Sequence, residues 1–204
     1  MTEYDRWQKR FSVPEYIFGE KPNGFLAAQK PLLPATGRAL SIADGEGRNG
    51  VWLAEQGLDV HAIDFSPAAL EKARALAAKR GVKIQTELAD VISWHYPDAT
   101  YDMVAVIFTQ FMDPQQRDQV FEGIRRTLKP GGLLLIEGYT PRQLQYGTGG
   151  PKQEDHMYTR ELLEHAFAGY TNMEISEYDV EMNEGTAHGG MSAVIDFTAH
   201  KPAG

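Results

Sequence analysis

Carboxylates and glycines meet in one short segment of this chain, S-I-A-D-G-E-G-R-N-G at residues 41–50. Its second part, G-E-G-R-N-G, matches the G-x-G-x-x-G pattern of strand-to-helix turns that bind nucleotide cofactors. The turn also carries Asp44 and Glu46, and carboxylates at close range repel a pyrophosphate. The pattern therefore predicts a nucleotide-like ligand, and the charges favour one that is cationic where it meets this loop.

Two further acids follow apolar runs in the same way. Asp64 lies 19 residues after Gly45, close to the spacing of about 20 at which an acid binds the ribose hydroxyls in such folds. Asp90 follows the next apolar run. Because the carboxyl ends of parallel strands meet at one edge of a sheet, we expect Asp44, Asp64 and Asp90 to surround one site.

The elements that must position these acids follow from an alternation of apolar runs and helical segments. Nearly continuous apolar strands predict a parallel sheet covered on both faces. The predicted strands are residues 39–43, 59–64, 82–88, 101–108 and 133–139, and the predicted helices are 51–57, 66–80, 115–128 and 159–167. Two strand-like segments, 171–182 and 191–200, are joined by a glycine-containing loop at 183–190 and predict an antiparallel hairpin at the sheet edge.

Length and composition indicate an ordinary globular chain. With 204 residues we expect one domain, divided into an N-terminal extension or lid at 1–37 and a catalytic core at 38–204. The net charge of −8 and the lack of a basic block argue against a nucleic-acid partner. The chain has no cysteine, no metal-binding motif and no apolar run of membrane length, so we expect no metal, no membrane and a cytoplasmic location, as a monomer or homodimer.

The ordered set of motifs resembles the class I S-adenosylmethionine-dependent methyltransferases. It consists of I-A-D-G-E-G-R-N-G, H-A-I-D-F-S, E-L-A-D, Y-D-M-V-A-V-I-F, L-K-P-G-G-L-L-L-I-E-G-Y and the final hairpin, over roughly residues 38–200. Y-I-F-G-E-K-P-N-G-F-L, L-Q-Y-G-T-G-G-P-K and G-T-A-H-G-G-M-S-A-V-I are similar to small bacterial members related to tellurite-resistance and thiopurine methyltransferases. The resemblance implies a Rossmann-like, three-layer α/β/α fold with a mostly parallel seven-stranded sheet, and S-adenosylmethionine as the cofactor.

S-adenosylmethionine carries a sulfonium and an ammonium but no phosphate, which fits an acidic glycine loop. The resemblance implies that Asp64 binds the ribose, that Phe65 lies against the adenine and that Asp90, with the Val91 amide, faces the adenine amino group. The remaining expected cofactor contacts are Ala43, Asp44, Gly45, Glu46, Gly47, Asn49 and Ile107. The usual D-x-G-x-G-x-G begins here with Ser41 and has Ala43 in place of its first glycine, so Asp44 or the Ala43 carbonyl is expected to bind the ammonium.

The acceptor pocket is expected to form from the extension, the ends of the fourth and fifth strands and the hairpin loop. Tyr139 and His188 are the candidates for positioning the substrate at the reacting centre. The other expected substrate contacts are Tyr16, Phe18, Gln110, Phe111, Tyr146 and His156. Related methyltransferases often place a histidine where Gln110 stands, and a glutamine cannot act as a base.

Two alternatives remain open beside a methyltransferase acting on a small-molecule acceptor by in-line transfer. An NAD(P)-binding oxidoreductase would use the same glycine pattern but meets the opposing charges of Asp44 and Glu46. A protein that binds S-adenosylmethionine without catalysis would fit the departures at Ser41, Ala43 and Gln110.

Overall fold

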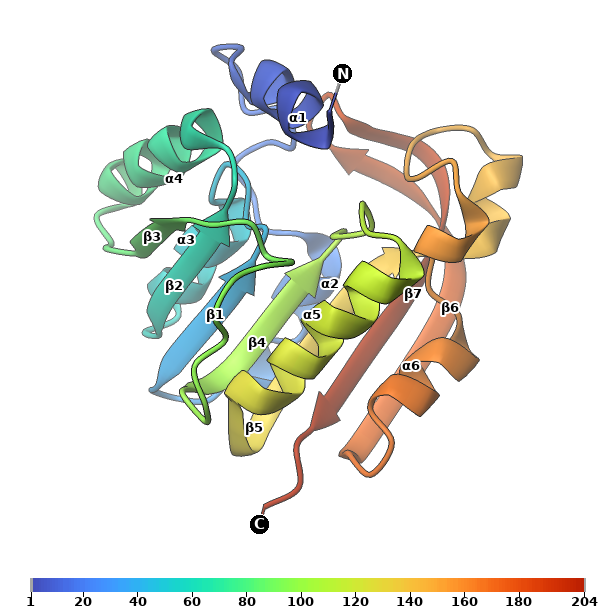
Figure 1. The fold of residues 1–204 in the computed structure, drawn as a ribbon. Helices are drawn as coiled ribbons and strands as arrows, with labels where there is room; N and C mark the ends of the chain where they lie inside the picture. Colours follow the sequence, from blue (N-terminus) through green and yellow to red (C-terminus); the bar gives the residue numbers. More distant parts are fainter. Residues whose placement is uncertain (1, 204) are drawn as a thin grey trace.

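Seven strands form one mixed sheet in the computed structural model, which describes residues 2–203 (Figure 1). The strand order is β3-β2-β1-β4-β5-β7-β6. The strands are β1 (Arg38–Ile42), β2 (Asp59–Asp64), β3 (Gln85–Leu88), β4 (Tyr101–Ile107), β5 (Leu128–Tyr139), β6 (Thr171–Glu184) and β7 (His188–His200). The strand order reverses between β1 and β4, and ligands bind beyond the carboxyl ends of strands at such a point.

The first five strands pair in parallel, and β7 pairs antiparallel with both β5 and β6. In the centre Ser41 pairs with Ala62 on one side and with Ala105 on the other. This register brings the ends of β1, β2 and β4 to one edge. The predicted Rossmann-like sheet with an antiparallel C-terminal hairpin is confirmed.

Helices cover both faces of the sheet (Figure 1). One face packs on α2 (Gly24–Ala28) and α3 (Arg48–Glu55), with α4 (Pro67–Arg80) against α3. The other face packs on α5 (Pro114–Thr127) and α6 (Arg160–Ala166). Three short 3₁₀ turns, η1 (Lys30–Leu32), η2 (Pro141–Gln145) and η3 (Glu154–His156), lie in the connections.

Helix α4 shows how the local sequence sets an element's ends. The Ser66 hydroxyl caps the amide of Ala69, and Pro67 occupies the first turn, where its missing N–H costs nothing. Gly81 adopts a left-handed φ of 70°, and the Val82 amide donates to the carbonyl of Ala77. Because Val82 completes this helix end, β3 begins at Gln85, and the predicted start of the strand at residue 82 is wrong.

The N-terminal helix α1 (Glu3–Phe11) lies over the carboxyl ends of the strands, next to the curled end of the β6–β7 hairpin (Figure 1). A reciprocal capping box between Thr2 and Asp5 starts this helix. The hairpin strands pair as far as Glu184 and His188, so the predicted loop at 183–190 is longer than the observed turn. No helix among residues 2–203 combines the length and the apolar character needed to cross a membrane.

Candidate functional site

The loop between β1 and α3 forms the floor of a cavity at the strand ends. Ala43, Gly45 and Gly47 have positive φ values of 50°, 59° and 88°, a region that glycine adopts at little cost. A Cβ on Gly47 would lie 2.7 Å from the Cα of Ala73, so only glycine lets the loop pack on α4. The two loop glycines thus serve the backbone's path as well as a ligand's approach.

Asp44 is buried in this loop, and only one of its two carboxylate oxygens is hydrogen-bonded to the described residues. Its Oδ1 accepts from the Ser41 hydroxyl at 2.6 Å and from the Gly50 amide at 3.0 Å. Its buried Oδ2 has no hydrogen-bond partner among residues 2–203. Burial raises the pKa of Asp44 to about 7. Asp44 lines the cavity, so a cation there would stabilise its charged form.

Asp64, at the end of β2, lies beside the same loop. Its Oδ2 accepts from the Gly45 amide at 2.9 Å, and its Oδ1 accepts from the Ser66 amide at 2.8 Å. Burial raises its pKa to about 6, against the lowering effect of those amides. Each oxygen keeps a lone pair for a further donor, as a ribose diol would require.

Glu46 and Asn49 hold the N-terminal segment to the loop. The buried Glu46 carboxylate pairs with Lys72 at 2.7 Å and accepts from the Phe18 amide at 3.4 Å. Glu46 does not line the cavity, and Lys72 neutralises the charge that was expected to discriminate between ligands. Asn49 does line the cavity and accepts from the Asn23 amide at 2.9 Å.

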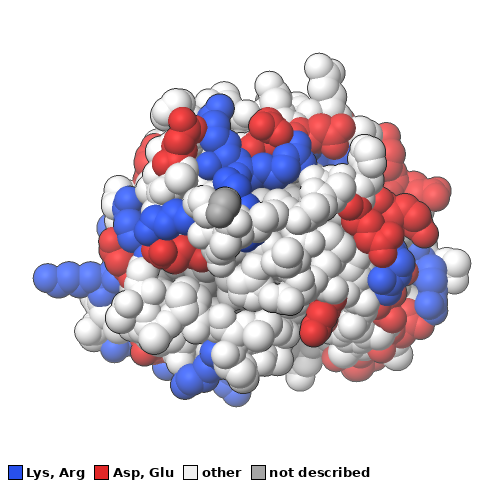
Figure 2. All heavy atoms as spheres, turned by 90° about the horizontal axis from the view of Figure 1, so that it is seen from below, with Lys and Arg blue, Asp and Glu red and all other residues white. Residues whose placement is uncertain are grey.

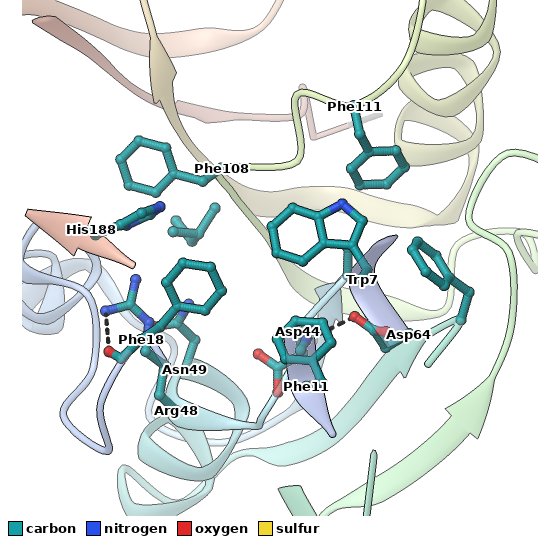
Figure 3. A pocket seen from close by; sticks show the side chains of 14 residues that line it. Trp7, Phe11, Phe18, Asp44, Arg48, Asn49, Asp64, Phe108, Phe111 and His188 are labelled. Carbon is teal, nitrogen blue, oxygen red and sulfur yellow. Dashed lines mark hydrogen bonds between the residues drawn. The ribbon is translucent and has the colours of Figure 1, made fainter. Parts of the chain in front are cut away.

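The cavity combines carboxylates on its floor with aromatic rings above (Figure 3). Asp44 and Asp64 lie at the lower centre and right of the view, while His188 and Phe108 lie at the upper left. The lining residues are Trp7, Phe11, Phe18, Ala43, Asp44, Gly45, Arg48, Asn49, Asp64, Phe65, Ile107, Phe108, Phe111 and His188. The structure therefore gathers most of the expected cofactor contacts around one space.

Trp7, Phe11, Arg48 and Phe108 line this cavity but were not among the predicted site residues. Trp7 and Phe11 are four residues apart on α1, and their rings stack with centroids 5.4 Å apart. That spacing marks one helix face and could have identified them. Phe108 has a φ of 54°, which is a left-handed conformation. No local pattern in the sequence predicts this conformation.

Asp90 and Val91 lie outside this cavity. Asp90 is exposed, its Oδ1 accepts from the Ile92 amide at 3.0 Å, and it lines a neighbouring groove with Phe65 and Phe111. Val91 is buried, and its carbonyl accepts from the Tyr96 hydroxyl. Phe65 and Phe111 line both spaces, so a flat group could extend from the cavity towards Asp90.

A second cavity adjoins the first on the side of the hairpin. The residues that line both are Trp7, Phe18, Phe108, Phe111 and His188. The residues that line the second alone are Glu3, Arg6, Arg10, Gln110, Tyr139, Gly149, Gly150, Pro151, Lys152, Gln153, His156 and Ala187. Two compartments that share an aromatic wall can place two ligands end to end.

His188 lies at this junction. Its ring packs edge-on against Phe18 and Phe108, with centroids 4.6 Å apart in both cases. Its Nδ1 lies 3.5 Å from Oε2 of Glu184. Burial lowers the pKa of His188, so the imidazole is neutral at pH 7. Tyr139 packs 6.0 Å from the same ring and faces the second cavity, and burial raises the pKa of its hydroxyl.

The remaining predicted substrate contacts differ in position. Gln110 lines the second cavity, but its amide group accepts from the Tyr139 amide and donates to the Tyr139 carbonyl. His156 also lines that cavity. Tyr16 and Tyr146 line neither cavity, and the Tyr16 hydroxyl donates to the Lys72 carbonyl at 3.0 Å.

A buried polar network behind the cavity joins four segments distant in sequence. Arg48 of α3 pairs with Glu184 of the hairpin at 2.7 Å. The Asn23 side chain donates to Glu137 at 2.5 Å and to Glu184 at 3.2 Å. Burial raises the pKa of Glu137 well above its ordinary value, and Asp196 adds to this shift. The network fixes the extension and the hairpin to the sheet.

The face away from the site carries mixed charge. Figure 2 shows the amino ends of the parallel strands, where basic and acidic side chains lie side by side around an uncharged centre. Residues 2–203 contain no group of three or more histidine, aspartate and glutamate side chains placed to hold a metal ion.

Comparisons with known proteins show similarity to methyltransferases. Residues 39–132 match the model of a methyltransferase domain. The demethylmenaquinone methyltransferase of Thermus thermophilus is 31% identical over 117 residues, which cover 56% of this chain and 53% of that protein. This chain thus spans about half the length of that curated relative and of a similar one from Deinococcus radiodurans.

Solved structures share the fold. One, from work on the conversion of a disulfide bond into a thioacetal group during echinomycin biosynthesis, has a TM-score of 0.77 at 17% identity and covers 98% of this chain and 92% of its own. The phosphoethanolamine N-methyltransferase 2 of Haemonchus contortus, solved with S-adenosylhomocysteine, has a TM-score of 0.71 at 20% identity and covers 99% and 61%. TehB from Haemophilus influenzae has a TM-score of 0.69 at 14% identity and covers 97% and 66%. The likeness to TehB is one of fold, so membership of the narrower tellurite-resistance and thiopurine group stays a prediction.

Proposed function

We propose that the chain is a class I S-adenosylmethionine-dependent methyltransferase, which binds S-adenosylmethionine above the β1–α3 loop and methylates a small molecule held in the second cavity. The observation that carries this proposal is the pair of buried carboxylates, Asp44 and Asp64, that line the cavity. Carboxylates at this position suit an ammonium and oppose the pyrophosphate of NAD(P). The oxidoreductase alternative has no such support.

The residues around the first cavity fit the parts of this cofactor. Asp44 would bind the ammonium, Asp64 the ribose hydroxyls, and Phe65 the adenine ring. When bound, S-adenosylmethionine supplies a methyl group activated by its sulfonium. The protein's part is to align the acceptor with that group and to exclude water, which the aromatic wall shared by the two cavities supports.

His188 is the residue that we propose for proton transfer when the acceptor arrives protonated. Its imidazole is neutral, and its Nδ1 faces Glu184, which leaves Nε2 for a proton from the acceptor. The Gln110 side chain cannot serve this purpose, and it is engaged with the backbone of Tyr139.

A methyl-release assay tests the proposal. The protein is incubated with methyl-labelled S-adenosylmethionine and a panel of thiols, phenols and amines, and S-adenosylhomocysteine is quantified. We expect turnover with at least one acceptor class, and a loss of more than about tenfold for phenols in His188→Asn. His165→Asn, at an exposed position on α6, is the control and should leave the rate unchanged. Cofactor binding without turnover on any acceptor would favour the non-catalytic alternative.

A further inference from the structure

The second cavity has a positive lining in a chain that is acidic as a whole. Its charged lining residues are Arg6, Arg10 and Lys152 against the single acid Glu3. Glu3 is already engaged, because it pairs with Arg6 at 3.3 Å and accepts from the Trp7 indole at 3.2 Å. The chain carries 28 acidic and 20 basic residues, so this local balance departs from that of the molecule.

Arg10 is held at the cavity by aromatic rings instead of by an acid. Its guanidinium lies 4.4 Å from the centroid of Trp7 and 5.7 Å from that of Phe18. Of the ion pairs formed within residues 2–203, none involves Arg10. Partial burial is the main reason that its pKa is lowered, and an anion beside it would reverse that effect.

Lys152 brings a second cation from the segment between η2 and η3. It is exposed and forms no ion pair with the other described residues. The rings of Phe18, Phe108 and Tyr139 line the same space. The cavity therefore combines flat aromatic walls with two cations, Arg10 and Lys152, whose N–H groups are free of ion pairs with the other described residues.

We propose that the methyl acceptor is a flat or aromatic anion whose carboxylate or similar oxyanion binds Arg10, with Lys152 at the rim. Planar guanidinium groups match carboxylates with two parallel hydrogen bonds, and stacking on Trp7 orients the guanidinium in advance. The same cations repel a protonated amine. The inference rests on the proposed function, since it concerns the acceptor side of that site.

Binding to matched probes tests this without the natural substrate. The protein is first titrated with S-adenosylhomocysteine, and the saturated protein is then titrated by calorimetry with 2-naphthoate, 2-naphthamide and 2-naphthylmethylammonium. We expect 2-naphthoate to bind at least about tenfold more tightly than the other two. Arg10→Gln should reduce this preference to less than about twofold.

Lys9→Gln is the control, because it removes the same charge from an exposed neighbouring position on α1 that lies outside the cavity. It should retain the preference. Two results with the unaltered protein would overturn the inference: equal affinity for the three probes, or no binding of 2-naphthoate. Two results with the variants would also overturn it: a preference for 2-naphthoate that survives Arg10→Gln, or one that is lost equally in Lys9→Gln. A failure to bind S-adenosylhomocysteine in the first titration would instead overturn the proposed function. If Arg10→Gln no longer binds S-adenosylhomocysteine, the inference is judged by whether the unaltered protein prefers 2-naphthoate to the other two probes.

Discussion

Asp44 lies between the Ser41 hydroxyl and the Gly50 amide, with its second oxygen buried and unpartnered. Ser41 stands where the motif of the methyltransferases that this chain resembles has an acid, and its hydroxyl donates to the acid three residues later. The charge is thus present in the loop, but it comes from a different position. A Cβ on Gly50 would lie 2.5 Å from the Asp44 carboxylate, so that glycine makes room for it.

The raised pKa of Asp44 predicts that cofactor binding depends on pH. Burial raises this pKa to about 7, so the group is mostly protonated, and carries no charge for an ammonium, below that pH. Affinity for S-adenosylhomocysteine should therefore rise by more than about tenfold between pH 5.5 and 7.5, measured by calorimetry. In Asp44→Asn the affinity should be lower, and the rise above pH 6.5 should disappear. An unchanged pH profile in this variant would show that Asp44 does not meet the ammonium.

Asp64 is expected to bind the ribose hydroxyls of the cofactor. Asp64→Ala should weaken S-adenosylhomocysteine binding by more than about 100-fold, because two hydrogen bonds to a charged acceptor would be lost. Asp59→Ala, at the exposed opposite end of β2, is the control and should bind normally. Thermal unfolding of both variants shows whether the fold is kept. Normal binding by a folded Asp64→Ala would mean that the ribose lies elsewhere.

At the scale of the elements, the site depends on segments that converge from four parts of the chain. The Arg48–Glu184 ion pair and the Asn23 side chain join α3, the hairpin and the extension. Glu46 and Lys72 join the glycine loop to α4. These contacts hold the hairpin turn and the segment around Asn23 against the glycine loop and its helix.

Breaking the Arg48–Glu184 pair should destabilise the fold. Glu184→Gln leaves the buried Arg48 without its counter-ion, and such a loss costs about 3 kcal/mol. The expected result is a drop of that size in the free energy of unfolding in urea. Glu181→Gln, at an exposed position on the same strand, should change it by less than about 0.5 kcal/mol. If Glu184→Gln were as stable as Glu181→Gln, the Arg48–Glu184 ion pair would have no role in stabilising the fold.

The sequence predicted these elements well where the signal is local. The capping serine and proline of α4 and the apolar runs of β1, β2 and β4 have direct counterparts in the structure. The ends of β3 and of the hairpin differed, because backbone pairing and helix termination decide them. Glu46 pairs with Lys72, which lies 26 residues later in the chain. Because the two residues are distant in sequence, no local pattern predicts this ion pair.

At the scale of the molecule, the strand reversal between β1 and β4 places both cavities over one edge of the sheet. Asp44 and Asp64 line the first cavity, whereas Arg6, Arg10 and Lys152 line the second. The order of motifs predicted the sheet. The second cavity lies where an acceptor pocket was expected, among the extension, the strand ends and the hairpin loop. Its basic lining was not predicted, because α1 and the segment at 149–153 meet there only in three dimensions.

Isothermal titration calorimetry with S-adenosylhomocysteine, S-adenosylmethionine, NAD and NADP shows which cofactor the first cavity binds. We expect both sulfur-containing ligands to bind with dissociation constants of about micromolar order, near −8 kcal/mol, and the dinucleotides not to bind measurably. Binding of a dinucleotide in preference to both sulfur-containing ligands, or binding of none of the four, would contradict this expectation.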